Sequence, residues 1–113
     1  MSIESLQAEL ASFARERDWE KFHSIRNLTL ALVGEVGELA EVIQWDGEIN
    51  LEHFANSPEK AKAFNEEIAD VFLYLLRLAD IAGIDIEKEA KLKMFSNAKK
   101  YPVSESFGNS KKR

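Results

Sequence analysis

The chain has no cysteine and only two prolines, five glycines and two histidines among its 113 residues. The absence of thiols excludes disulfides, zinc–thiolate centres and cysteine nucleophiles. It also suits a reducing compartment, so we expect a cytoplasmic protein. The two histidines, His23 and His53, are far apart and unpaired. Di-iron carboxylate bundles need a Glu-x-x-His motif on each of two helices, so iron chemistry is disfavoured.

Long apolar runs are missing as well. A membrane helix needs about 18 consecutive apolar residues, and no segment approaches that length. The first residues, MSIESLQAELASFARERDW, do not have the basic-then-apolar order of a signal peptide. The net charge of −5 argues against binding to duplex nucleic acid, which requires a basic face. We therefore expect neither a membrane nor a duplex nucleic acid as a partner.

Helical spacing of apolar residues dominates the rest of the chain, and no alternating strand pattern is present. The spacing and the capping residues predict an all-α fold with four helices and a short helical turn near 51–54, the long helices covering 2–17, 22–45, 58–82 and 86–101. The length fits one domain, which we place at 1–103. Residues 104–113 are polar and are predicted to form a flexible tail.

The stretch GEVGELAEVIQW, residues 34–45, places acid on an apolar helix face. At about 100° per residue, Leu28, Leu32 and Leu39 mark the centre of one apolar stripe. Glu35 falls inside this stripe and Glu38 at its margin. A carboxylate in such a position needs a partner.

The helix over 58–82 repeats this pattern. Glu67 and Asp70 lie three residues apart along the edge of its apolar stripe, and Tyr74 follows one turn later. If the two helices pack antiparallel through their apolar stripes, the pairs Glu35/Glu38 and Glu67/Asp70 converge.

Four converging carboxylates require a counter-charge, because burying unpaired anions costs several kcal/mol. A divalent cation supplies it most directly, and oxygen-only ligands suit Mg²⁺ where phosphates complete the coordination shell. Protonation or a lysine or arginine partner would also relieve the repulsion. A single acidic pair of this spacing is usually a solvated helix face, so the residues alone leave both interpretations open.

Three segments, EVGELAEVIQW, EEIADVFLYLLRLA and KLKMFSNAKKYP, together resemble the MazG-like all-α nucleoside triphosphate pyrophosphatases. The stretch ERDWEKFHSIRNLTLALVGEVGELAEVIQW is similar to the dCTP pyrophosphatase branch of that family. The resemblance covers about residues 3–103. It implies a four-helix MazG-like bundle and hydrolysis of a nucleoside triphosphate between the α- and β-phosphates.

The resemblance also implies roles for particular residues. Glu35, Glu38, Glu67 and Asp70 match the acidic quartet that binds Mg²⁺ and performs catalysis, with Mn²⁺ as a possible substitute. The positions that match substrate-binding residues are Trp19, His23, Trp45, Tyr74, Lys93, Asn97, Lys100 and Tyr101. The preferred substrate implied is dCTP or a modified dCTP.

Members of this family form dimers or tetramers with sites built between subunits, so we expect a homotetramer or, failing that, a dimer. Two other interpretations remain open. One is a MazG-like pyrophosphatase with broad specificity for ribo- and deoxynucleotides. The other is a non-catalytic helical oligomerisation or adaptor module whose acidic faces bind a basic partner.

Overall fold

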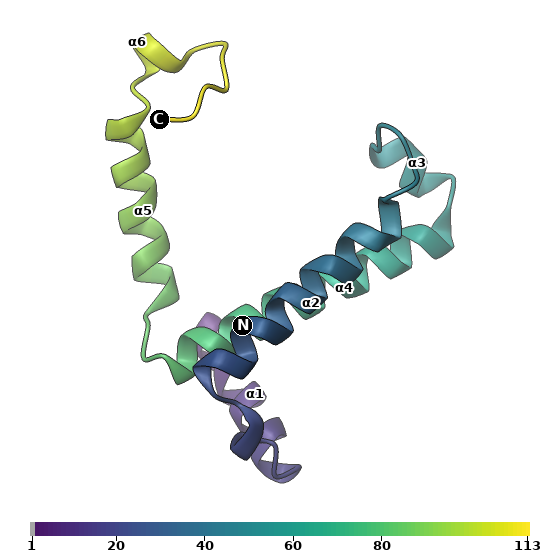
Figure 1. The fold of residues 1–113 in the computed structure, drawn as a ribbon, viewed down its shortest axis with the longest axis vertical. Helices are drawn as coiled ribbons and strands as arrows, with labels where there is room; N and C mark the ends of the chain where they lie inside the picture. The colour runs from purple at the N-terminus through teal and green to yellow at the C-terminus, as the bar shows by residue number, and fades with distance from the viewer. Residues whose placement is uncertain (1) are drawn as a thin grey trace. The chain divides into compact units, whose positions relative to one another are not determined.

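The computed structural model describes residues 2–113, and every regular element in that range is helical (Figure 1). The elements in chain order are α1 (Ile3–Glu16), η1 (Glu20–Phe22), α2 (Ile25–Ile43), α3 (Leu51–Ala55), α4 (Pro58–Ile81), α5 (Ile86–Lys100) and α6 (Val103–Ser106). The predicted all-α class is confirmed. Within residues 2–113, the helices are all too short or too polar to cross a membrane.

Local capping explains most helix boundaries. The predicted start of the second long helix at residue 22 is wrong, because residues 20–22 form a separate 3₁₀ turn and α2 begins at Ile25. The Ser24 hydroxyl accepts a hydrogen bond from the backbone N–H of Asn27 at 3.0 Å, which fixes this boundary. Pro58 begins α4 as predicted, although the Ser57 side chain makes no capping hydrogen bond. The predicted helical turn near 51–54 is confirmed as α3.

The chain forms two compact units, 1–83 and 84–113. In the first unit, α2 and α4 lie side by side and antiparallel, joined by the segment that contains α3 (Figure 1). Helix α1 packs on α4, where the Gln7 side chain donates a hydrogen bond to the Leu76 carbonyl at 2.9 Å. Leu28 of α2 and Leu76 of α4 are the largest fully buried side chains. The antiparallel pair is the arrangement that the acidic motifs required.

The second unit consists of α5 and α6 with the C-terminal residues. Asp85 caps α5 by accepting a hydrogen bond from the backbone N–H of Lys88 at 3.1 Å. Residues 103–106 form the short helix α6, which the sequence did not predict. The Tyr101 hydroxyl accepts a hydrogen bond from the backbone N–H of Arg113 at 2.9 Å, and Arg113 also pairs with Glu105 at 2.7 Å. The domain boundary at residue 103 and the flexible tail stay predictions.

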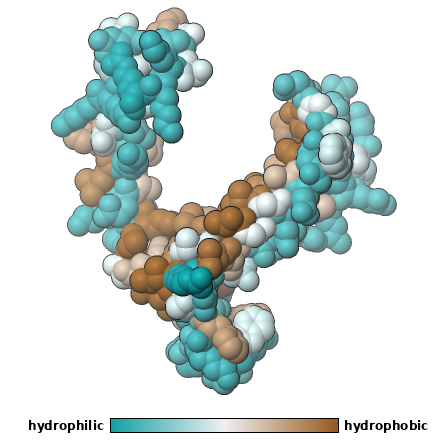
Figure 2. Space-filling model, viewed as in Figure 1, coloured by the Kyte–Doolittle hydropathy of each residue, from teal (hydrophilic) through white to brown (hydrophobic). Residues whose placement is uncertain are grey.

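Large apolar side chains are exposed along the α2–α4 hairpin, and apolar surface covers much of its visible face (Figure 2). The exposed side chains include Ile25, Leu30, Val33 and Val36 on α2 and Ile68, Phe72, Leu75 and Ile81 on α4. Monomeric proteins rarely leave so continuous an apolar face in water. The face is therefore a candidate surface for association.

Candidate metal centre and adjoining pocket

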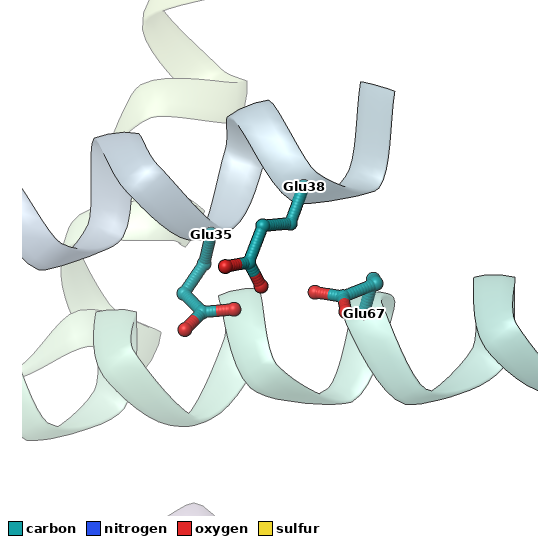
Figure 3. Close-up of side chains that lie close together, drawn as sticks. All are labelled: Glu35, Glu38 and Glu67. Atoms are coloured by element: carbon teal, nitrogen blue, oxygen red, sulfur yellow. The ribbon is translucent and has the colours of Figure 1, made fainter. Parts of the chain in front are cut away.

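Three glutamates converge between the two long helices of the first unit (Figure 3). Glu35 and Glu38 come from consecutive turns of α2, and Glu67 comes from the facing side of α4. One carboxylate oxygen from each lies within 4.8 Å of the others. The spacing of three residues on α2 and the antiparallel packing of α4 produce this arrangement. We call these three residues the glutamate cluster.

Two oxygens of the glutamate cluster are buried without a partner. Oε2 of Glu35 and Oε2 of Glu67 are inaccessible to solvent, and no group within residues 2–113 donates a hydrogen bond to either. A buried acceptor that lacks a donor costs about 1–3 kcal/mol, and more when it is charged. The protein therefore presents unsatisfied, anionic oxygen atoms at one point. Such atoms suit a cation that is not part of the chain.

The raised pKa values of Glu35 and Glu67 also indicate that the glutamate cluster lacks a neighbouring positive charge. Burial, followed by the neighbouring carboxylates of Glu38 and Asp70, raises the pKa of Glu35 to about 7. Burial, together with Glu38 and Asp70, also raises the pKa of Glu67. A divalent cation would reverse both effects by stabilising the ionised carboxylates. A hard cation with oxygen ligands thus fits the donor set, as Mg²⁺ does.

Asp70, the fourth predicted ligand, lies one turn beyond Glu67 on α4. It is half-buried and lies outside the glutamate cluster, but its charge acts on both Glu35 and Glu67. Its carboxylate also lines the pocket that adjoins the cluster. Its role as a metal ligand stays a prediction.

The adjoining pocket lies among α1, η1, α2 and α4, and aromatic residues form much of its wall. Its lining residues are Leu10, Phe13, Ala14, Trp19, His23, Leu28, Asp70, Leu73, Tyr74 and Arg77. Three predicted substrate residues, Trp19, His23 and Tyr74, are thus brought together in one cavity. The Phe13 and Trp19 rings meet edge to face, with centroids 5.7 Å apart. We call this cavity the aromatic pocket.

Sequence reasoning missed Arg77 as a pocket residue. It is only 7% exposed, although it carries a full charge. Its Nε donates a hydrogen bond to Nδ1 of His23 at 3.1 Å, and its Nη1 lies 3.4 Å from an Asp80 carboxylate oxygen. The signal was present in the sequence LLRLA, where one cation interrupts an apolar run.

The other predicted substrate residues are not in the aromatic pocket. Trp45 follows the C-terminal end of α2 and is 90% exposed. Lys93, Asn97 and Lys100 are exposed on α5 in the second unit. Tyr101 is the C-terminal cap of α5. Their predicted contacts with a nucleotide stay predictions.

Several known proteins are similar to this chain in sequence, and one solved structure is similar in fold. The family model described as the MazG-like family matches residues 31–113. The dCTP pyrophosphatase 1 proteins of Bos taurus and Homo sapiens are each 44% identical, over 96% and 98% of this chain respectively. The crystal structure of a pyrophosphatase from Archaeoglobus fulgidus superposes with a TM-score of 0.77 at 39% identity, covering 88% of this chain and 91% of that one.

The chain spans 64% of the length of the cattle protein and 65% of the human one, so less than two thirds of either. The family match itself covers most of the chain, including every member of the glutamate cluster and all of α4. The pocket-lining residues from Leu10 to Leu28 precede the matched range. The family match over residues 31–113 shows that this chain belongs to the MazG-like family.

Proposed function

We propose that this protein is a Mg²⁺-dependent pyrophosphohydrolase that converts a deoxynucleoside triphosphate to the monophosphate and pyrophosphate. The observation that carries the proposal is the glutamate cluster, whose buried oxygens lack partners, directly beside the aromatic pocket. Relatives named dCTP pyrophosphatase 1 support the same activity and favour dCTP or a modified dCTP as substrate.

Glu35, Glu38, Glu67 and Asp70 would hold the metal. When bound, Mg²⁺ supplies positive charge that neutralises the triphosphate and makes water easier to deprotonate. In the reaction, the oxygen of a water molecule forms a bond to the α-phosphorus. The bond from that phosphorus to the bridging oxygen of the β-phosphate breaks, and pyrophosphate leaves with the electron pair. One of these four carboxylates acts as the general base and takes the proton of the water.

The aromatic pocket would hold the base. Stacking on an aromatic side chain contributes about 1–3 kcal/mol per base but discriminates little between bases. The pocket offers Trp19 for stacking and Tyr74 near the carboxylate end, where the phosphates would lie. Lys93, Asn97, Lys100 and Tyr101 are proposed to contact the phosphates, because the triphosphate needs positive charge and hydrogen-bond donors beyond those of the metal.

We propose further that the chain works as a homotetramer or, failing that, a dimer. The exposed apolar face of the α2–α4 hairpin supports association, since a second copy would remove it from water. The 90% exposure of Trp45 supports it too, because this ring is not among the residues that line the aromatic pocket. In such an assembly, Trp45 of one subunit would contact a base bound by a neighbouring subunit.

Pyrophosphate release from a panel of nucleotides, measured with and without Mg²⁺, tests the proposal. The expected result is Mg²⁺-dependent release that is fastest with dCTP or 5-methyl-dCTP. Equal rates with ribo- and deoxynucleotides of every base would indicate a MazG-like enzyme of broad specificity. No release from any nucleotide would contradict the proposal and favour a helical adaptor module.

A further inference from the structure

The buried arginine of α4 has an unusual principal partner. Arg77 is 7% exposed, and among the described residues its carboxylate contact is with Asp80 at 3.4 Å, whose side chain is 43% exposed. Its Nε–H instead donates to the ring of His23 at 3.1 Å. Burying an arginine is costly unless its N–H groups find acceptors. The hydrogen bond therefore holds the side chains of Arg77 and His23 in their relative positions.

The contact determines the protonation state of His23. A guanidinium has donors and no acceptor, so Nδ1 of His23 must be the acceptor and carries no proton. The ring is then neutral with its single proton on Nε2. A protonated ring would have no acceptor for Arg77 and would place two cations together. Burial and the charge of Arg77 accordingly lower the pKa of His23, against the smaller opposing effect of Glu20.

The position of the pair along α4 orders the pocket from end to end. Asp70, Tyr74 and Arg77 follow one another on a single face of α4, at i, i+4 and i+7. Seven residues of helix span about 10 Å along the axis. The carboxylates therefore lie at one end of the aromatic pocket, and His23 with Arg77 lies toward the other. A nucleotide whose phosphates lie near Asp70 would direct its base toward His23.

We propose that Arg77 is a positioning residue that holds His23 as a fixed donor, so that Nε2–H donates a hydrogen bond to the accepting edge of a cytosine base, at N3 or O2. Within residues 2–113 the hydrogen bond to the His23 ring is the one that Nδ1 accepts from Arg77, which leaves Nε2–H available to a ligand. The inference rests on the proposed function and adds to it a source of base selectivity. A contact at N3 would separate cytosine from thymine and uracil, whose N3 carries a proton and would present a donor to a donor; O2 is an acceptor in all three bases.

A thermodynamic cycle tests whether Arg77 acts through His23. We expect Arg77→Met to lower kcat/KM for dCTP by roughly threefold to tenfold, the effect of losing one neutral hydrogen bond, mainly through KM. His23→Ala should have a similar effect, and adding Arg77→Met to His23→Ala should cost nothing further. The control is Asp80→Asn, which leaves the bond between Arg77 and His23 and should keep kcat/KM within twofold of the wild type. Additive losses from the two changes would overturn the inference.

Base analogues identify the accepting atom. The 3-deaza analogue of dCTP lacks the N3 acceptor, and the 2-thio analogue has a weaker acceptor at O2. The wild type should discriminate against at least one of them by threefold or more, and Arg77→Met should lose that discrimination. Equal rates with dCTP and both analogues on the wild type would overturn the inference.

Nitrogen-15 NMR of the imidazole gives a readout that does not depend on activity or on a variant that folds. The wild type at pH 7 should show His23 as the neutral Nε2–H tautomer. A ring that is mainly protonated, or mainly Nδ1–H, would overturn the inference even if turnover is normal. If the wild type releases no pyrophosphate at all, the proposed function is wrong, and so is the assignment of a cytosine base as the ligand of His23 Nε2–H. Normal turnover with unchanged base selectivity in Arg77→Met overturns this inference alone.

Discussion

The raised pKa of Glu35 makes the stability of the metal-free protein depend on pH. An unfolded glutamate has a pKa of 4.5, and in the folded chain burial and neighbouring carboxylates raise it to about 7. Between these values the folded protein holds a proton that the unfolded chain releases. The resulting stabilisation is complete below about pH 4.5 and is lost as the pH rises through about 7.

The rise in pKa from 4.5 to about 7 gives this effect an upper bound of about 3.4 kcal/mol, at 1.36 kcal/mol per pKa unit. Because the side chain is partly open to solvent, screening reduces it to about 1–2 kcal/mol. For a chain of this size that corresponds to a change in Tm of about 5 °C. The pKa of Glu67 is raised as well, so Glu35 and Glu67 titrate as coupled groups.

The assay compares wild type with Glu35→Gln by thermal melting in EDTA at fixed protein concentration. Glutamine imitates the protonated carboxyl group, so the Tm of the wild type relative to the variant should fall by about 5 °C between pH 5 and pH 8. Glu66→Gln is the matched control, because Glu66 is exposed and its ion pair within the described residues is with Lys62, at 4.0 Å. The difference in Tm between Glu66→Gln and the wild type should not change with pH. A Glu35→Gln difference that is flat, or that rises with pH, would refute the reasoning.

Other predictions follow from the same sites. Glu38→Gln should abolish turnover while metal-free Tm holds or rises, because one repelling charge is removed; wild-type turnover of dCTP in saturating Mg²⁺ would show that Glu38 is not a ligand. Trp45→Ala should lower kcat/KM for dCTP, because stacking on an aromatic side chain contributes about 1–3 kcal/mol per base, and unchanged rates would make Trp45 purely structural. Sedimentation at micromolar concentration should give a tetramer or dimer, and a monomer would contradict assembly through the apolar face.

The helices and the glutamate cluster could be predicted because both follow from local spacing. Glu35 stands inside an apolar stripe, and an i, i+3 interval places Glu38 on the same face of α2. Their convergence with Glu67 needed only the antiparallel packing of two amphipathic helices. The predicted start of α2 was wrong by three residues. The side chain of Ser24 caps the helix, and apolar periodicity alone carries no information about a cap.

The contact between Arg77 and His23 could not be predicted, because it joins residues 54 apart in the chain. Periodicity places Arg77 on the same face of α4 as Asp70 and Tyr74, but the partner depends on how η1 folds over that face. The predicted phosphate contacts of Lys93 and Lys100 depend in the same way on tertiary and quaternary arrangement. Spacing on one helix fixes only which side chains share a face.

Hydrolysis of dCTP in ¹⁸O-labelled water with Mg²⁺, with products identified by mass spectrometry, tests the central claim most directly. The account predicts dCMP and pyrophosphate in equal amounts, with the label in dCMP because water attacks the α-phosphorus. It also predicts no products when Mg²⁺ is removed, and none with the Glu35→Gln variant. Formation of dCDP and phosphate, label in the pyrophosphate, or no hydrolysis in the presence of Mg²⁺ would contradict the account.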